Sequence, residues 1–300
     1  MTYEEFWRPL MAVYDIREAQ AVARLVLEER YSLTLADVLC GRMGDERELL
    51  LIQARLLQGE PVQYVLGEAM FGGRRFHVAP GVLIPRPETF ELCQWVMTAD
   101  ALKPASEAAT EQSAAKILDI GTGSGCIACT LAAELPHTQV TAWDISDDAL
   151  RIAKSNAEAL GVNVKFEQVD VLSTLLASLR WQATKGRAHP SCVPSVASVN
   201  VIVSNPPYIC ERERTSMEGR VVDYEPEGAL FVPDDDPLLF YRAIARYARQ
   251  TLTQGGGLFF EINPLYVNEL EQLLTDSGFA SVESRNDQFG KIRFTKAIQP

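Results

Sequence analysis

Four consecutive residues, Asn205, Pro206, Pro207 and Tyr208, carry groups suited to holding a planar NH2 group. They follow the apolar run VNVIV, which has the composition of a buried strand. The prolines have no backbone N–H to give to a sheet, so the strand ends at them. The Asn205 side chain and the Pro206 backbone then offer two carbonyl oxygens at a fixed separation. The Tyr208 ring can stack on the flat group that carries the nitrogen.

This arrangement suits the activation of a weak nucleophile. An amide or aryl NH2 group reacts poorly because its lone pair is delocalised. Two acceptors on its hydrogens favour a pyramidal nitrogen, and fixed carbonyl dipoles stabilise the positive charge that develops as a bond forms. Holding the nitrogen in line with a sulfonium methyl group supplies the remaining rate acceleration by proximity. Taken alone, however, Asn-Pro-Pro is also a turn sequence.

A glycine-rich segment, LDIGTGSGCIA, precedes this motif in the chain and reads as a strand, a loop and the start of a helix. Glycines let a backbone turn sharply and approach a ligand closely. The segment contributes five candidate cofactor-binding residues: Gly121, Thr122, Gly123, Ser124 and Gly125. The dinucleotide pattern G-x-G-x-x-G fails from Gly121 because Cys126 takes the last position. Shifted by two residues it ends on Ala128, so the spacing leaves NAD binding open.

Acidic residues are expected at the ends of the next two strands. Asp144 closes QVTAWD, where a carboxylate can accept hydrogen bonds from ribose hydroxyls. Asp170 ends the following strand, and with Val171 it could hold an adenine by its amino group and its face. An acid after a strand can instead cap a helix, and Asp147 is an alternative cap here. Together with the glycines, these residues predict a cofactor that contains a nucleoside; whether it also carries a diphosphate stays open.

The elements that must position these residues change in character along the chain. Residues 1–75 read as short capped helices, with capping-box spacing from Thr2 to Glu5, and we expect a substrate-docking domain. Residues 76–114 form the second half of a hairpin, which turns at Gly72 and Gly73, and a linker. Residues 115–300 alternate strand and helix, which predicts a parallel sheet with helices on its faces. The polar segment 182–198 reads as a surface insertion.

Composition excludes several classes of function. The 300 residues carry a formal net charge of −12, which disfavours direct binding of duplex nucleic acid through its phosphates. No run of 18 apolar residues predicts a membrane span. The acidic start and six scattered cysteines are typical of a cytoplasmic protein with reduced thiols. Cys126 and Cys129 have C-x-x-C spacing, but without a second pair we interpret them as small apolar residues on one helix face and expect no metal.

The combination of glycine loop, strand-end acid and Asn-Pro-Pro-Tyr resembles the amino-methyltransferases that use S-adenosylmethionine. That motif is shared by enzymes that act on adenine or cytosine in DNA, guanine in RNA and glutamine in protein. Other segments resemble one branch, the peptide-chain release factor glutamine N5-methyltransferases. These are GVLIPRPETFEL (family I-P-R-P-E-T-E), DYEPEGALF (Y-E-P-x-x-A-L), PLLFYRAI, FFEIN (E-I-G) and DQFGKIRF (D-x-x-G-x-x-R). The resemblance covers nearly the whole chain.

The resemblance implies a Rossmann-like, seven-stranded class I methyltransferase domain of the α/β class, joined by a β-hairpin to a small N-terminal helical bundle. It implies methyl transfer from S-adenosylmethionine to the glutamine of the Gly-Gly-Gln loop in class I release factors. The catalytic residues would be Asn205, Pro206 and Tyr208, and Pro207 would complete the substrate pocket. The cofactor would be held by the list Gly121, Thr122, Gly123, Ser124, Gly125, Asp144, Asp170, Val171 and Asn205.

The chain departs from the family pattern at Phe90, where a second glutamate is usual, and at Asn263, which replaces a usual glycine. These departures bear on substrate docking rather than on the reaction. Three other readings remain: a nucleic-acid adenine methyltransferase, a non-catalytic adaptor that binds release factors, and a nicotinamide dehydrogenase. The acidic net charge disfavours the nucleic-acid methyltransferase. The intact Asn205 and Asp144 disfavour the non-catalytic adaptor. A nicotinamide dehydrogenase would leave the Asn-Pro-Pro-Tyr motif unexplained.

Overall fold

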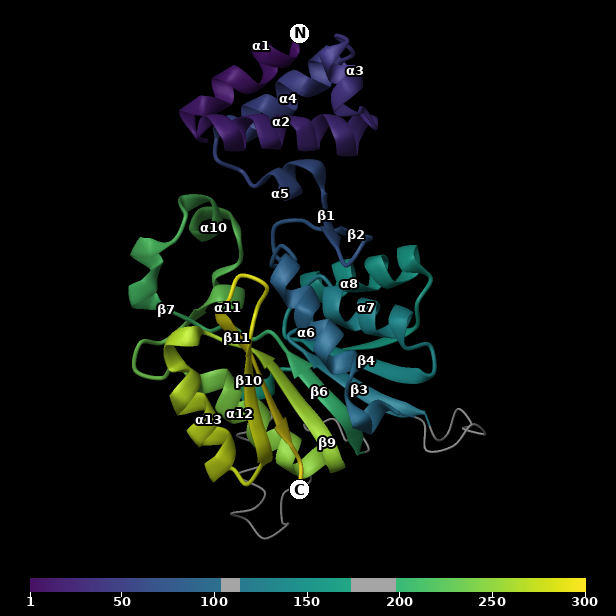
Figure 1. Ribbon diagram of the computed structural model, residues 1–300, viewed down its shortest axis with the longest axis vertical. Helices are drawn as coiled ribbons and strands as arrows, with labels where there is room; N and C mark the ends of the chain where they lie inside the picture. The colour runs from purple at the N-terminus through teal and green to yellow at the C-terminus, as the bar shows by residue number, and fades with distance from the viewer. Residues whose placement is uncertain (104–113, 174–197) are drawn as a thin grey trace.

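A seven-stranded sheet forms the centre of the larger part of the protein (Figure 1). The computed structural model describes residues 1–103, 114–173 and 198–300. In spatial order the strands are β10 (Ala280–Asn286), β11 (Ile292–Ile298), β9 (Leu252–Glu261), β6 (Val199–Ser204), β3 (Ala115–Ile120), β4 (Thr138–Asp144) and β5 (Val164–Gln168). From β9 to β5 all neighbours are parallel, whereas β11 is antiparallel to both β9 and β10. The predicted seven-stranded methyltransferase fold is therefore confirmed.

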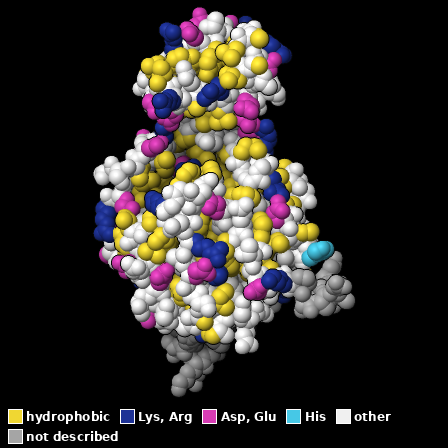
Figure 2. Space-filling view, in the orientation of Figure 1, with side chains coloured by type: hydrophobic (Ala, Val, Ile, Leu, Met, Phe, Trp, Pro, Cys, Tyr) yellow, Lys and Arg dark blue, Asp and Glu magenta, His cyan; other side chains and the backbone are white. Residues whose placement is uncertain are grey.

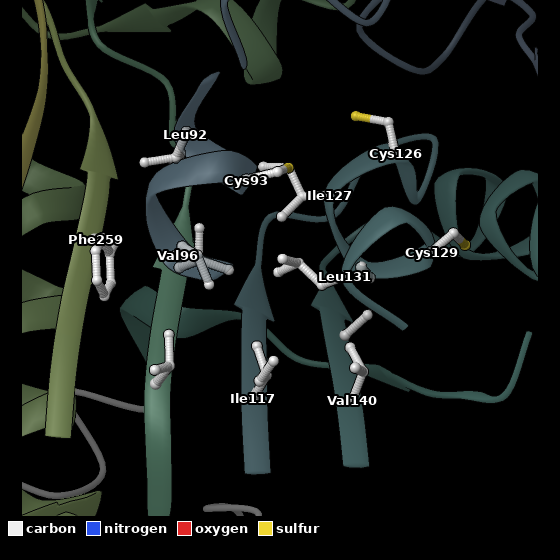
Figure 3. Packing of buried hydrophobic residues seen from close by; sticks show 14 of the residues in the cluster. Leu92, Cys93, Val96, Ile117, Cys126, Ile127, Cys129, Leu131, Val140 and Phe259 are labelled. Atoms are coloured by element: carbon white, nitrogen blue, oxygen red, sulfur yellow. The ribbon is translucent and has the colours of Figure 1, made fainter. Parts of the chain in front are cut away.

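Helices cover both faces of this sheet, as parallel strands require (Figure 1). On one face, α6 (Pro87–Met97) and α7 (Cys126–Glu134) pack on the strands. Figure 3 shows Leu92 and Val96 of α6 and Leu131 of α7 packed over Ile117 and Val140 of the sheet. On the other face, α12 (Leu239–Thr251) and α13 (Val267–Asp276) bury a second apolar cluster. The helix α8 (Asp147–Leu160) lies beside α7 and follows β4.

The two cysteines with C-x-x-C spacing belong to the first of these cores (Figure 3). Burial raises the pKa of both Cys126 and Cys129 to about 12, so their thiols stay protonated at neutral pH. No cluster of metal-ligating side chains occurs in the described ranges. The prediction that both residues are apolar packing residues is confirmed.

The N-terminal segment folds as a small helical bundle above the sheet (Figure 1). It comprises α1 (Tyr3–Trp7), η1 (Arg8–Ala12), α2 (Ile16–Tyr31), α3 (Leu35–Leu39), α4 (Glu46–Leu57) and α5 (Val62–Leu66). The predicted capping box forms between Thr2 and Glu5, and Asp45 caps α4 by accepting from the Glu48 N–H. The bundle has its own core, with Phe6, Leu10 and Leu27 among its fully buried side chains.

A hairpin of β1 (Glu68–Phe71) and β2 (Arg74–His77) joins the bundle to the sheet domain. Gly72 and Gly73 are its two turn residues, and both have positive φ, as a two-residue turn of this kind requires. The ring of Phe90 on α6 packs edge-on against Phe71, with ring centroids 5.6 Å apart. A Cβ added to Gly72 would lie only 2.4 Å from the Phe90 ring, so this contact requires a glycine. Phe90, one of the departures from the family pattern, therefore anchors the hairpin to α6.

A second connection between bundle and sheet domain comes from the segment after β6. This segment contains β7 (Ile209–Cys210), η4 (Glu211–Ser216), α10 (Gly219–Tyr224), α11 (Glu227–Leu230) and β8 (Phe231–Val232). Arg220 on α10 pairs with Glu18 of the bundle at 2.7 Å. The Tyr224 hydroxyl donates to the backbone carbonyl of Gln58 at 2.9 Å. The bundle is thus attached at two places, the hairpin and α10.

The remaining segments include two that the sequence analysis singled out. The linker and nearly all of the insertion expected at 182–198 lie outside the described residues. Pro87 takes the first turn of α6, where its missing N–H costs no helical hydrogen bond. The described residues also include two short 3-10 turns, η2 (Asp100–Leu102) after α6 and η5 (Pro264–Tyr266) after β9. Within the described part of the chain, no helix combines the length and apolar character needed to cross a bilayer.

We predict that Phe90→Ala lowers the free energy of unfolding by about 2 kcal/mol, because it removes a half-buried ring from the hairpin contact. Phe289→Ala is the matched control, since Phe289 is 75% exposed and should change stability by less than about 0.5 kcal/mol. Urea unfolding of both variants measures the difference. Equal stabilities would show that Phe90 does not anchor the hairpin.

Candidate active site

The ends of five adjacent strands form a row along one edge of the sheet. The last paired residues of β3 and β6 are Ile120 and Ser204, so Gly121 and Asn205 follow directly side by side. On the other side of β3, Ile120 pairs with Trp143, which places Asp144 beside Gly121. Beyond β6, Ser204 pairs with Phe260, which places Glu261 beside Asn205. The fold therefore brings the glycine loop, the strand-end acid and Asn205 to one edge, where parallel sheets bind ligands.

The glycine loop turns sharply between β3 and α7. Gly121, Gly123 and Gly125 all have positive φ, between 54° and 80°. Packing requires a glycine only at position 125, since a Cβ added to Gly125 would lie 3.0 Å from the Cβ of Ala153. At Gly121 and Gly123, by contrast, a Cβ would meet no described atom within 4 Å apart from its chain neighbours. These two glycines leave open space at the edge of the sheet, which a ligand can approach closely.

The side chains between the glycines point away from that space. Thr122 is buried, and its hydroxyl donates to Asp119 Oδ2 at 2.6 Å. Ser124 is also buried, and its backbone carbonyl accepts from the Asn156 side chain at 2.8 Å. These residues fix the loop from beneath, so only their backbone groups lie near the open side. Burial raises the pKa of Asp119 to about 7, and the neighbouring Asp144 adds to this shift.

Asp144 holds the open side of the loop. Its Oδ2 accepts from the Gly123 N–H and its Oδ1 from the Ser146 N–H, each at 2.9 Å. It does not cap α8; the cap is Ser146, whose hydroxyl accepts from the Ala149 N–H. Each carboxylate oxygen has one such donor and a remaining lone pair, so a half-buried Asp144 can still accept from a hydroxyl pair.

The sequence predicts Asp170 to be the last residue of its strand, and this prediction is wrong. The strand β5 ends at Gln168, the last residue paired with β4, and the Val169 N–H makes the last hydrogen bond to that strand, with the Asp144 carbonyl at 2.9 Å. Asp170 then accepts from the Leu172 N–H at 2.9 Å and from the Ser173 hydroxyl. Its carboxylate caps the following turn, and Val171 beside it is half-buried.

Two side chains from distant parts of the sequence, Thr89 and Glu261, support Asn205 and Tyr208. The Tyr208 hydroxyl donates to Glu261 Oε1 at 3.1 Å, and the Thr89 hydroxyl donates to Glu261 Oε2 at 2.7 Å. Asn205 Nδ2 donates in turn to Thr89 Oγ1 at 3.4 Å. Glu261 is 2% exposed, and burial raises its pKa. Pro206 is buried and Pro207 half-buried, so the motif forms a rigid wall.

Asn263, the second departure from the family pattern, also supports this wall. Its Nδ2 donates to the Tyr208 carbonyl at 3.1 Å and to Glu213 Oε1 at 3.0 Å. Its Oδ1 accepts from the Leu265 N–H at 3.0 Å. Where a glycine could make none of these bonds, the asparagine links η5 to the backbone of the motif.

Two of the family-like segments contact each other directly. Arg86, from IPRPE, forms an ion pair with Glu225, from YEPEG, and Glu225 Oε2 also accepts from the Ile84 N–H at 3.0 Å. Glu225 is 4% exposed, so the pair fixes the segment after the motif against the start of α6. Thr89 lies one turn further along α6, and the ion pair therefore helps to place it.

The chain is similar in sequence to known methyltransferases. The model for a methyltransferase domain matches residues 111–215. A release factor glutamine methyltransferase of Bacteroides thetaiotaomicron is 41% identical over 293 residues, which cover 96% of this chain and 95% of that protein. A second, of Flavobacterium psychrophilum, is 36% identical over 97% of this chain and 96% of its own length.

The chain belongs to the release factor glutamine methyltransferase family. Among solved structures, the hMettl16 catalytic domain in complex with the MAT2A 3′UTR hairpin 1 has a TM-score of 0.50 at 14% identity, covering 94% of this chain and 80% of that one. At that identity the match shows a shared fold. The methyltransferase fold and the family membership are thus established together.

Sequence reasoning missed four side chains of this family member's site. Thr89 and Glu261 lie in segments that the family resemblance quoted, yet neither was assigned a role. Glu261 ends β9 and Asp119 is the last residue but one of β3, so both are acids near a strand end, the signal that identified Asp144. Ile145, next to Asp144, is 63% exposed and offers an apolar face to a ligand at this edge.

Alanine at two of the glycines should separate packing from ligand access. Gly125→Ala adds backbone strain and overpacks Ala153, so we expect it to cost about 3 kcal/mol of unfolding free energy. Gly123→Ala should cost only about 1 kcal/mol, since it adds strain without a collision. Urea unfolding measures both, and a calorimetric titration with S-adenosylmethionine should show that folded Gly123→Ala binds it weakly. Full affinity in Gly123→Ala would mean that the ligand does not approach the loop.

Proposed function

We propose that this protein transfers a methyl group from S-adenosylmethionine to the side-chain amide nitrogen of the glutamine in the Gly-Gly-Gln loop of class I release factors. The observation that carries the proposal is the register of β3 and β6, which sets Asn205 directly beside the glycine loop. A group held by the loop and a group held by Asn205 would then meet at one edge of the sheet. The names of the relatives support the choice of substrate.

The residues around the loop suit S-adenosylmethionine. Gly121 and Gly123 leave space for close approach, Asp144 has acceptor capacity for ribose hydroxyls, and Ile145 offers an apolar face for adenine. Asp170 and Val171 lie beyond them at the end of β5 and complete the adenine side. When bound, the cofactor supplies a methyl group on a sulfonium centre.

Asn205 and Pro206 would hold the amide nitrogen. The Asn205 carbonyl oxygen and the Pro206 backbone carbonyl accept from the two hydrogens of the substrate NH2 group and stabilise the positive charge that develops there. Tyr208 flanks the amide, and its hydroxyl bond to Glu261 keeps its ring in place. No residue needs to act as a strong base during the transfer, because the nitrogen loses its proton after the bond has formed.

The helical bundle would dock the release factor and take no part in the chemistry. A glutamine loop alone buries too little surface for stable binding of a large protein, so a second contact surface is needed. The bundle exposes apolar side chains: Met11, Ile16, Leu35, Leu39, Leu50 and Leu51. Figure 2 shows apolar side chains gathered on the bundle and in the hollow beneath it. We place the protein in the cytoplasm, where release factors act and free thiols such as Cys40 persist.

Asn205→Ala should slow single-turnover methylation of a release factor by about 100-fold or more, the scale of losing one preorganised polar group. The matched control is Asn268→Ala, because Asn268 is exposed on α13 and should be replaceable without effect. Quenched-flow measurements with saturating S-adenosylmethionine would compare the two. A near-normal rate in Asn205→Ala would remove this residue from the reaction.

Charges placed on the bundle should affect only the large substrate. The double variant Leu39→Asp, Leu51→Asp replaces side chains that are 76% and 69% exposed, so the fold should persist. We expect KM for the intact release factor to rise by about tenfold or more. The rate with a short Gly-Gly-Gln peptide, which cannot reach the bundle, should not change. If methylation of the peptide fell as much as methylation of the release factor, the substitutions would be acting on the catalytic domain, and the docking role would be wrong.

A further inference from the structure

The two ends of the Asn205 amide are not equivalent for the proposed reaction. Its Oδ1 accepts hydrogen bonds, whereas its Nδ2 only donates. A substrate NH2 group presents hydrogens, so Asn205 is useful only if Oδ1 faces the substrate. The reversed orientation would set a donor against a donor and repel the substrate. Something must therefore hold the amide in one orientation.

The hydrogen bonds that run from Glu261 through Thr89 to Asn205 allow only one orientation of the Asn205 amide. An ionised Glu261 can only accept, and it accepts from both the Tyr208 hydroxyl and the Thr89 hydroxyl. Thr89 has a single hydroxyl proton, and this bond uses it. Thr89 Oγ1 can therefore only accept on its remaining side, and the group that faces it there is Asn205 Nδ2. Each proton in the chain is assigned once Glu261 carries its charge.

We propose that Thr89 and Glu261 are positioning residues that orient the Asn205 amide, with Nδ2 toward Thr89 and Oδ1 toward the substrate nitrogen. This inference rests on the proposed amide methylation. Neither residue touches the reacting atoms; each acts through Asn205. The arrangement links three segments that are remote in sequence, the start of α6, the end of β6 and the end of β9. It also gives Glu261, a buried acid on an apolar strand, a specific role.

Protonation of Glu261 would disturb the orientation. A protonated carboxyl donates one hydrogen, which can go to Thr89 Oγ1 and free the threonine hydroxyl to donate to Asn205 Oδ1 instead. Burial raises the pKa of Glu261 above the ordinary 4.5, so this proton arrives as the pH falls through a range above that value. Titratable groups around Glu261 are Glu88 and Cys93 on α6, Tyr208, Tyr241 on α12 and Arg293 on β11. The pKa of Tyr208 is also raised, and its hydroxyl stays a donor.

The direct test replaces the Thr89 hydroxyl in the full-length protein. Thr89→Val keeps the shape of the side chain but supplies no acceptor, so we expect the single-turnover rate on a class I release factor to fall roughly tenfold or more. Thr89→Ser keeps the hydroxyl and should restore most of the rate. Affinity for S-adenosylmethionine, measured by calorimetry, should not change in either variant. Thr130→Val is the control for deleting a buried threonine hydroxyl, because no described residue bonds to Thr130 Oγ1.

A second measurement addresses the glutamate. The wild-type rate should decline on the acid side as Glu261 gains a proton, and Glu261→Gln should be slower and lack this acid limb. A purely structural role for Glu261 would lower stability without removing the limb. If Thr89→Val matches the wild-type rate, or if Glu261→Gln keeps the wild-type pH profile, the inference is wrong. If the wild-type protein methylates no glutamine, the proposed function fails instead, so the two failures are distinguishable.

Discussion

The site depends on one pairing, the parallel register of β3 and β6. Because Ile120 is paired with Ser204, the residues that follow each of them, Gly121 and Asn205, emerge side by side. The Ser204 hydroxyl donates to the Ile120 carbonyl at 2.6 Å and holds the two ends together after the sheet hydrogen bonds stop. A shift of one residue in this register would turn every side chain of β6 to the opposite face and move Asn205 away from the loop. Both cores of the sheet domain contain residues of β3 and β6, so the hydrophobic packing itself fixes the register.

Much of this arrangement could be predicted from the sequence because its signals are local. Positive φ at Gly121 and Gly123 follows from a strand that must turn at once into a helix, and Pro206 and Pro207 end a strand wherever they occur. Alternating strands and helices predict parallel strands, and parallel strands bring their carboxyl ends to one edge. The fold class, the hairpin turn and the closeness of the glycine loop to the Asn-Pro-Pro-Tyr motif could therefore be predicted from the sequence.

The remaining features depend on contacts between distant segments, which no local pattern encodes. Thr89 and Glu261 are far apart in sequence, and their hydrogen bond exists only because α6 packs against β9. Phe90 and Asn263 read as departures from a family pattern, but in the structure one anchors the hairpin and the other ties η5 to the Tyr208 carbonyl. In each case a tertiary hydrogen bond or ring contact outweighs the local preference.

The central claim is that the carbonyl groups of Asn205 and Pro206 select a primary amide nitrogen beside the glycine loop. Tandem mass spectrometry after incubation of the protein with S-adenosylmethionine tests it directly, with a class I release factor, the same factor with its Gly-Gly-Gln glutamine changed to glutamate, and an adenine-containing oligonucleotide. The account predicts one added methyl group, on the side-chain nitrogen of that glutamine, and none on the other two substrates. Methylation of the oligonucleotide, or of the release factor at any other atom, would contradict it.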